Sequence, residues 1–211
     1  RYLIMCGRYV VTNPVSKTKS LVKTAIKVED KENYNAHPYQ DLPVIKKYTN
    51  GNALENLKWG LVPSWSKKKE FKPLINARLE TIDEKIFFKK LIQLTRCVAV
   101  ADGFYEWKHE ERNKIPYYFL RNDKKFMYIA GIYEKDQFCL ITEKANKNIT
   151  AIHHRQPVIL DKTDVNKYLN IELNGSNFLM ECKKPVLEFY EVSKEVNKPT
   201  NNSISLIQKT A

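Results

Sequence analysis

Short runs of β-branched and aromatic residues recur along the whole chain and constrain its fold more than any other feature. Runs of this kind, bounded by turn-forming residues, are typical of β-strands. They occur at residues 8–11, 44–48, 57–61, 96–101, 104–107, 116–120, 126–133 and 138–142. Residues 121–124 separate two of these runs and read as a hairpin turn. The pattern therefore predicts a domain built mainly from strands.

Helical periodicity is clear in three places. The first is 14–25, where Asn13 can cap the helix and Pro14 can occupy its first turn. The second is 83–94, and the third begins at Thr163. Internal repeats, flexible linkers and heptads are absent from the 211 residues. We predict one α+β domain, predominantly β, with peripheral helices.

The charge of the chain favours a polyanionic partner. Lys and Arg number 36 against 24 Asp and Glu, a formal net charge of +12. Lysine runs such as 46–47 and 67–69 are more often solvated surfaces than binding sites, so only non-specific affinity for anions follows. No apolar run approaches the roughly 20 residues that cross a bilayer. We therefore expect a cytoplasmic, nucleoid-associated protein with no membrane partner.

The four cysteines are far apart and form no CxxC pair, so we expect neither a zinc site nor a disulfide framework, and no metal or cofactor. Cys97 and Cys139 lie in apolar runs and read as buried strand residues. Cys182 reads as the end of a helix. Only Cys6, which directly follows Met5, has a setting that suggests chemistry.

Removal of Met5 would leave Cys6 with a free α-amine beside its thiol. Such a 1,2-aminothiol condenses with aldehydes, because the amine forms a Schiff base and the thiol then closes a five-membered thiazolidine. The amine is partly neutral at pH 7, whereas the thiol needs a neighbour that helps it to ionise. We therefore expect acid and base residues close to Cys6 in the fold.

Two segments could supply them. In 75–81, polar and apolar residues alternate, so Asn76, Arg78 and Glu80 would project from one side of an extended segment. A solvent-facing sheet edge explains this alternation equally well. In 101–107, Glu106 stands between two aromatic residues, a setting that tends to raise a carboxyl pKa and suits a general acid or base. A salt-bridged strand glutamate is the alternative.

A third segment places His153 and His154 next to Arg155. Adjacent histidines in an extended segment point to opposite faces, so we expect at most one of them to enter a site. A metal-binding pair of histidines is therefore disfavoured.

Taken together and in order, these segments resemble the SOS-response-associated peptidase (SRAP) family from Met5 to about Val196. The resemblance is carried by Met5-Cys6-Gly7-Arg8, Tyr34-Asn35 with Pro38, 59–65 (WGLVPSW), Asn76-Ala77-Arg78 with Glu80-Thr81, 101–107, Ala145-Asn146, 153–157, Val192-Ser193 and Val196-Asn197. It implies a single domain over residues 5–200, with a compact antiparallel, barrel-like sheet. Residues 1–4 would then be an extension before it, and 201–211 a loose tail. We expect a monomer.

The resemblance also implies a function, the covalent capture of abasic sites in single-stranded DNA. By position, Cys6 would be the nucleophile, Asn76 would hold its amine or the sugar, and Glu106 would transfer protons. His153 would assist opening of the deoxyribose ring and reversal of the crosslink. The implied DNA contacts are Arg8 and Arg78 on phosphates, Pro38 and Trp65 as wedging or stacking residues, and Thr142 as a weaker candidate.

Two departures from the family pattern matter. His154 and Gln156 stand where the family commonly has an acidic residue and a methionine, and we choose His153 as the site histidine because it follows the apolar Ile152. Residues 1–4 before Met5 would keep the Cys6 nitrogen in a peptide bond. Two alternatives thus stay open: a Cys–His thiol peptidase that removes its own N-terminal residues, and a DNA-binding module without chemistry.

Overall fold

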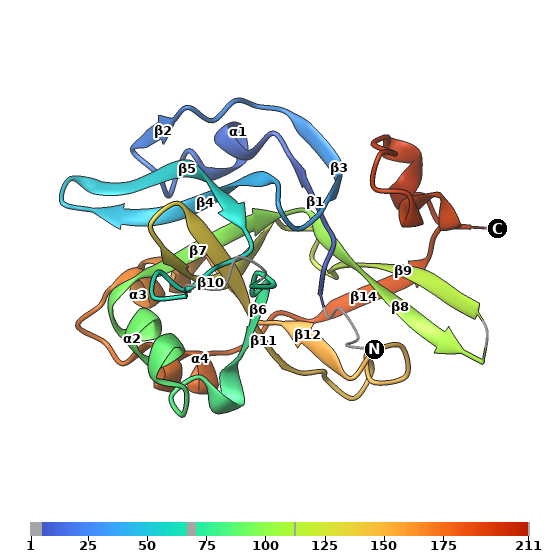
Figure 1. Cartoon of the computed structure of the whole chain (residues 1–211). Coiled ribbons are helices and arrows are strands. Elements are labelled where there is room, and N and C mark those ends of the chain that lie inside the picture. Colours follow the sequence, from blue (N-terminus) through green and yellow to red (C-terminus); the bar gives the residue numbers. More distant parts are fainter. Residues whose placement is uncertain (1–5, 67–70, 112, 211) are drawn as a thin grey trace.

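The computed structural model describes residues 6–66, 71–111 and 113–210, and its strands form two sheets (Figure 1). The five-stranded sheet has the order β14-β9-β8-β1-β3. Its strands are β1 (Tyr9–Thr12), β3 (Glu32–Ala36), β8 (Gly103–Glu110), β9 (Asn113–Arg121) and β14 (Leu187–Glu191). All of its pairings are antiparallel.

The second sheet closes on itself. Its path is β12-β11-β10-β7-β4-β5-β2, and β11 also pairs with β5, so β11, β10, β7, β4 and β5 form a ring. The strands are β2 (Thr24–Ile26), β4 (Asp41–Tyr48), β5 (Gly51–Trp59), β6 (Asn76–Arg78), β7 (Arg96–Ala101), β10 (Met127–Glu134), β11 (Gln137–Lys144), β12 (Arg155–Pro157) and β13 (Ile159–Leu160). Closure leaves fewer open strand edges and encloses the main apolar core, with Trp59 fully buried in it.

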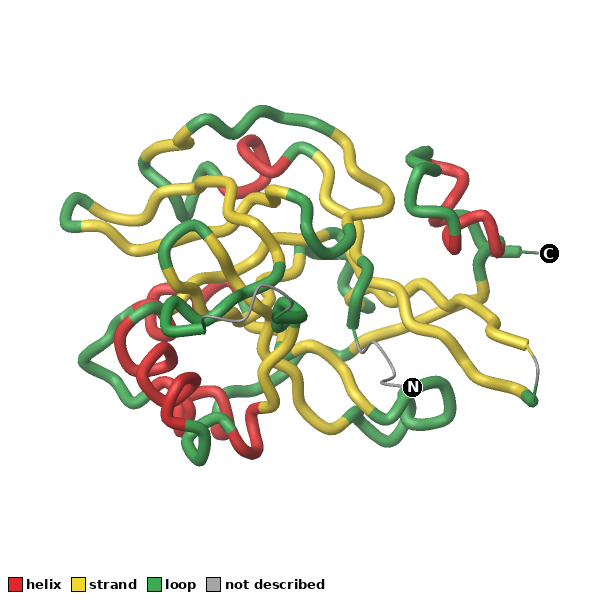
Figure 2. Tube along the Cα trace, viewed as in Figure 1, coloured by secondary structure: helices red, strands yellow, loops and turns green. Residues whose placement is uncertain are grey.

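The helices are short and lie outside the sheets (Figure 2). The α-helices are α1 (Pro14–Thr18), α2 (Ile86–Leu94), α3 (Val165–Leu169) and α4 (Gly175–Glu181). The 3-10 helices are η1 (Leu79–Thr81), η2 (Lys162–Asp164), η3 (Lys194–Asn197) and η4 (Ile204–Ile207). The prediction of an α+β, predominantly β, barrel-like fold is confirmed. Among the described residues, no helix is long and apolar enough to span a membrane.

Every predicted strand run coincides with or overlaps an observed strand, but two local predictions are wrong. The helix expected over 14–25 ends at Thr18, whose hydroxyl donates to the Pro14 carbonyl, and β2 begins at Thr24 to pair with β5. Asn13 adopts a left-handed backbone and makes no side-chain cap. The turn at 121–124 is no hairpin, because β9 and β10 belong to different sheets.

The lysine runs also differ from expectation. Lys46 is buried rather than solvated: its ammonium lies 2.7 Å from Glu55 Oε1 and 4.2 Å from the centre of the Tyr133 ring. Burial of a cation requires such partners, since an unpaired charge inside a protein is strongly unfavourable. Residues 67–69 lie outside the described residues. Cys97 and Cys139 are buried and Cys182 caps the end of α4, as predicted.

The C-terminal segment is packed, which differs from the loose tail expected at 201–211. Leu206 is 2% exposed within a small apolar cluster that includes Tyr105 and Tyr190. The Asn202 side chain accepts a hydrogen bond from the backbone of Tyr34 in β3, and Thr210 N donates to Glu191 O. Figure 1 shows this segment (red) beside β3. Leu206 is the buried apolar residue of the segment, whereas Ile204 stays exposed, and the sequence alone does not distinguish the two.

We expect Leu206→Ala to lower the free energy of unfolding by about 2–5 kcal/mol, because it removes a buried leucine side chain and leaves a cavity. Ile204→Ala is the matched control, since Ile204 lies two residues earlier in the same 3-10 helix and is 58% exposed. Urea denaturation of the two variants is the measurement. Equal stability of both variants would contradict the packing described for this segment.

Candidate active site

Antiparallel pairing of β1 with β8 brings Cys6 to Glu106. Tyr9 lies opposite Phe104 and Val10 opposite Gly103, so residues before Tyr9 run beside those after Phe104. The chain at Gly103 passes so close to β9 that a Cβ there would lie 2.4 Å from the Phe119 carbonyl oxygen. A side chain at this position would thus push β8 away from β9 and displace the segment that carries Glu106.

The Cys6 nitrogen and the His153 ring share one carboxylate oxygen. Cys6 N donates to Glu106 Oε1 over 2.7 Å, and His153 Nδ1 lies 3.7 Å from the same atom. All three residues are buried, with Glu106 only 2% exposed. The structure thus gathers three of the residues predicted as catalytic, although they are separated by about a hundred and by about fifty positions in the sequence.

Burial raises the pKa of the Glu106 carboxyl to about 7, although hydrogen bonds from Cys6 and Trp107 act in the opposite direction. The sequence predicted a raised pKa from the flanking aromatic residues. Tyr105 and Trp107, however, belong to the apolar cluster of the C-terminal segment, on the other face of β8. The raised pKa therefore arises from residues brought over Glu106 by the tertiary fold, and it suits proton exchange near neutral pH.

The Cys6 thiol differs from expectation. Burial raises its pKa well above the ordinary value, and the Glu106 carboxylate raises it further. Arg155 lowers the pKa, but as the smallest of these contributions. Burial and the Glu106 carboxylate, to which both the backbone nitrogen and the thiol of Cys6 are hydrogen-bonded, therefore keep the thiol protonated.

His153 enters the site and His154 does not. His153 is 6% exposed, whereas His154 is exposed, in keeping with the choice of His153. The two rings do not point to opposite faces as expected for an extended segment, because the turn at 147–152 leads into them and they lie side by side with centroids 4.6 Å apart. Burial lowers the pKa of His153, and its Nδ1 lies 3.1 Å from the Arg155 carbonyl oxygen. The ring is thus neutral at pH 7, and its orientation is held by the backbone of Arg155.

The 75–81 segment is only partly extended. Asn76 and Arg78 lie on β6, which runs parallel to β11 with Asn76 opposite Leu140 and Arg78 opposite Thr142. Glu80 belongs to the 3-10 turn η1 and leaves the strand face that the alternation predicted. Its carboxylate instead accepts hydrogen bonds from both terminal nitrogens of Arg155, over 2.7 and 2.9 Å.

Arg155 is the residue that sequence reasoning missed. It is 5% exposed, and besides Glu80 it donates to the Thr142 carbonyl over 2.7 Å. Its own backbone holds the His153 ring, and its charge acts on Cys6. The available signal was its place two residues after His153 in the same motif, yet no local pattern showed that Glu80 would be its partner.

The residues expected to contact DNA differ in how far their side chains are exposed to solvent. Arg78 is exposed, and Trp65 is 67% exposed with its ring edge-on to Phe87. Pro38 is half-buried in the turn between β3 and β4. Arg8 is half-buried too, and donates to Asn35 Oδ1 over 2.6 Å and to Val196 O over 2.8 Å.

Thr142 does not meet the expectation of a DNA contact. It is fully buried, and its hydroxyl accepts a hydrogen bond from Arg155 over 3.1 Å. A DNA strand lying on the protein surface could not reach the Thr142 hydroxyl. Its place on β11 makes it a support for the Arg155 side chain.

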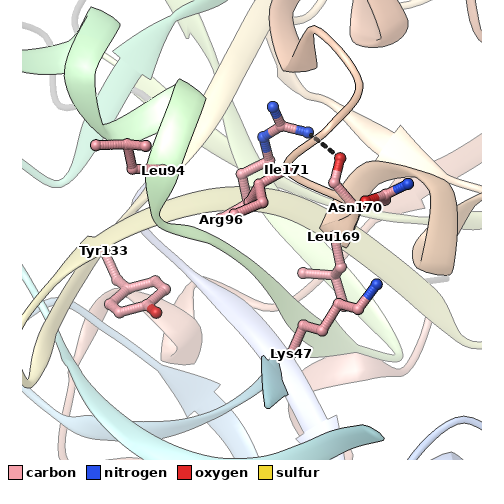
Figure 3. A pocket seen from close by; sticks show the side chains of 7 residues that line it. All are labelled: Lys47, Leu94, Arg96, Tyr133, Leu169, Asn170 and Ile171. Atoms are coloured by element: carbon pink, nitrogen blue, oxygen red, sulfur yellow. Dashed lines mark hydrogen bonds between the residues drawn. The ribbon is translucent and has the colours of Figure 1, made fainter. Parts of the chain in front are cut away.

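Metal and small-molecule sites do not emerge near Cys6. Within the described parts of the chain, no cluster of His, Cys, Asp and Glu is arranged to hold a metal ion. A pocket of about 240 Å³ lies elsewhere, between the end of α2 and α3 (Figure 3). Its central Arg96 donates to the carbonyl oxygens of Tyr168, Asn170 and Leu173, so that guanidinium ties loops together.

Comparison with known proteins now decides the family. The sequence profile described as SOS response associated peptidase (SRAP) matches residues 5–199. The chain belongs to this family. Abasic site processing protein YoqW of Bacillus subtilis (strain 168) is 33% identical, over 97% of this chain and 99% of its own length. Abasic site processing protein YedK of Escherichia coli (strain K12) is 29% identical, over 97% and 99%.

The chain is also similar in sequence to a vertebrate protein and in structure to a solved bacterial protein. Abasic site processing protein HMCES of Gallus gallus is 31% identical, over 81% of this chain and 64% of its own. A crystal structure of a protein from Bacteroides thetaiotaomicron superimposes with a TM-score of 0.82 at 24% identity, over 98% of this chain and 100% of that one. This second likeness shows that the fold is shared.

The raised pKa of Glu106 predicts an unusual pH dependence of stability. While the Cys6 nitrogen is an amide, the folded carboxyl stays protonated up to about pH 7, whereas the unfolded one ionises above roughly pH 4.3. The folded state therefore binds the extra proton in this window, and wild-type stability falls as pH rises through it. The stability of Glu106→Gln does not fall in this way, because glutamine does not titrate.

Between pH 4 and pH 7.5, the stability of Glu106→Gln relative to wild type should rise by about 3 kcal/mol, from the shift in pKa. Urea denaturation of both proteins at several pH values, in the chain that retains Met5, is the measurement. Parallel stability profiles for the two proteins would show that the carboxyl titrates normally.

Proposed function

We propose that this protein, once Cys6 is its first residue, captures abasic sites in single-stranded DNA as a thiazolidine crosslink and so shields them in the response to DNA damage. One observation carries the proposal: Cys6 N lies 2.7 Å from Glu106 Oε1, with His153 Nδ1 3.7 Å from the same oxygen. This arrangement places the Glu106 carboxyl, whose pKa burial raises to about 7 while the Cys6 nitrogen is an amide, at the nitrogen that would become the amine.

The first step is addition of the Cys6 amine to the aldehyde. An α-amine is largely protonated at neutral pH and must lose a proton before it can attack C1′ of the ring-opened sugar. Glu106 Oε1 is positioned to take that proton. The amine lone pair then forms the C–N bond, and the aldehyde oxygen becomes a hydroxyl.

The second step is loss of water and closure of the ring. Protonated Glu106 can return its proton to the hydroxyl, which leaves as water and gives a protonated imine. The Cys6 sulfur then bonds to the imine carbon while the thiol proton passes to the Glu106 carboxylate, so aldehyde and aminothiol combine with net release of one water. A thiol kept protonated by burial fits this order, because the amine reacts first.

The charge and the relatives support DNA as the substrate. The net charge of +12 favours a polyanion, and exposed Arg78 and Trp65 suit contacts with phosphates and bases. The YoqW, YedK and HMCES relatives are all named abasic site processing proteins. Asn76 would bind the amine or the sugar from β6, and His153 would assist opening of the deoxyribose ring.

The direct test is adduct formation. Protein with Cys6 at its N-terminus is incubated with uracil-containing single-stranded DNA that uracil-DNA glycosylase has treated, and the products are separated on a denaturing gel. We expect a heat-stable adduct of about 1:1 stoichiometry, absent from Cys6→Ala and slowed at least about tenfold in Glu106→Gln, because proton transfer contributes such factors.

Cys139→Ala is the matched control and should react like wild type, since Cys139 is a buried strand cysteine of the other sheet, on β11, whereas Glu106 lies on β8. An adduct that survives Cys6→Ala would contradict the proposal. DNA binding without any adduct would favour the DNA-binding module.

Self-removal of the residues before Cys6 is a second candidate function. Cys6 has a left-handed φ of +42°, a strained conformation for cysteine, and its amide nitrogen lies next to Glu106. The thiol would attack the Met5 carbonyl carbon and lose its proton to the Glu106 carboxylate, which would then give that proton to the departing nitrogen. Water would then hydrolyse the thioester and regenerate the thiol.

Intact mass of freshly purified protein separates self-removal from an outside aminopeptidase. Self-removal predicts loss of residues 1–5 in wild type and retention in Cys6→Ala and Glu106→Gln, because both the nucleophile and the proton donor are needed. Equal loss from wild type and Glu106→Gln would instead show that another enzyme exposes Cys6.

A further inference from the structure

The turn between β3 and β4 holds a bulky residue where the backbone favours glycine. Gln40 N donates to His37 O over 3.4 Å, so His37 to Gln40 form a β-turn with Pro38 second and Tyr39 third. Tyr39 has a φ of +76°, the value of a type II turn, whose third position favours glycine. A tyrosine here is strained, and such strain is concentrated at functional sites.

The Tyr39 ring makes few contacts within the protein that could offset this backbone strain. Its side chain is 56% exposed. A Cβ built on Gly60 would lie 3.5 and 3.6 Å from two Tyr39 ring carbons, so one edge of the ring packs over Gly60. Tyr39 N donates to Trp59 O over 2.7 Å, which fixes the backbone of the turn. The ring is thus held in place at one edge and open to solvent over the rest.

This ring stands at the border of the candidate active site. Tyr9 in β1 pairs with Ala36 in β3, and the strands are antiparallel, so the turn after Ala36 runs beside Cys6 to Arg8. The Arg8 guanidinium donates to Asn35, just before the same turn. A DNA strand whose sugar reached Cys6 would therefore pass the Tyr39 ring.

We propose that Tyr39 is a base-stacking residue, whose exposed ring packs against the nucleobase next to the abasic nucleotide. Aromatic rings on a positively charged surface bind single-stranded DNA in this way, because every base offers a flat face. The inference rests on the proposed function for its substrate, but it concerns non-covalent binding and is tested without the crosslink.

The test uses single-stranded oligonucleotides with a tetrahydrofuran abasic analogue, which has no aldehyde and cannot crosslink. The fluorescent base 2-aminopurine is placed on one side of the analogue in one oligonucleotide and on the other side in a second. Stacking on Tyr39 should quench the fluorescence in one of the two. Tyr39→Phe should keep the quenching, whereas Tyr39→Leu should lose it and bind about tenfold more weakly by fluorescence anisotropy.

Tyr39→Gly distinguishes a binding role from a structural one. It removes the ring and also the strain at φ +76°, so its thermal midpoint should equal or exceed that of wild type while its DNA affinity falls like that of Tyr39→Leu. Tyr48→Leu is the matched control for loss of an exposed tyrosine, since Tyr48 lies at the far end of β4 and is 42% exposed. It should bind and quench like wild type.

The outcomes separate the two proposals. Quenching and affinity unchanged in Tyr39→Leu, or a lower thermal midpoint in Tyr39→Gly, would overturn the stacking role even if crosslinking to true abasic sites is seen. Loss of quenching in Tyr39→Leu would support it even if no adduct forms and the proposed covalent capture fails.

Discussion

The hydrogen bond from Cys6 N to Glu106 Oε1 is the interaction around which the site is organised. A carboxyl group buried to this depth is unfavourable as an anion unless a donor meets it, and the Cys6 nitrogen is that donor. The same burial raises the pKa of Glu106 to about 7 and that of the Cys6 thiol well above its ordinary value. A thiol that stays protonated agrees with the proposed order of reaction, in which the amine adds to the aldehyde before the sulfur closes the ring.

Closure of the larger sheet supplies the other half of the site. Because β5 joins β11, the strand β6 and the segment before β12 are brought beside the N-terminal residues of the five-stranded sheet. Arg155 then links these parts, since it binds Glu80 and Thr142 with its side chain and His153 with its backbone. Burial keeps the histidine neutral, and the backbone of Arg155, whose side chain pairs with Glu80, orients its ring.

The C-terminal segment stabilises the outer side of the same region. The buried Asn35 amide donates to the carbonyl oxygens of Lys198 and Asn201, and its oxygen accepts from Arg8. Arg8 also binds Val196 O, so its orientation depends on residues at the end of the chain. With Tyr39 on the adjacent turn, this border combines a fixed cation with an exposed ring, the pairing that a single nucleic acid strand requires.

The sequence by itself determined the strand positions, the burial of Cys97 and Cys139, and the special setting of Cys6 after Met5, because alternation, apolar runs and the residue that precedes Cys6 are local properties. Only the tertiary structure decided that β9 and β10 lie in different sheets, that Glu80 pairs with Arg155, that Leu206 is buried, and that Tyr39 is strained and exposed. Even the raised pKa of Glu106, expected from its aromatic neighbours, arises from other residues, since those neighbours face the opposite side of β8. Desolvation and partner choice depend on segments far apart in the chain, and a local pattern carries no information about which of them will meet.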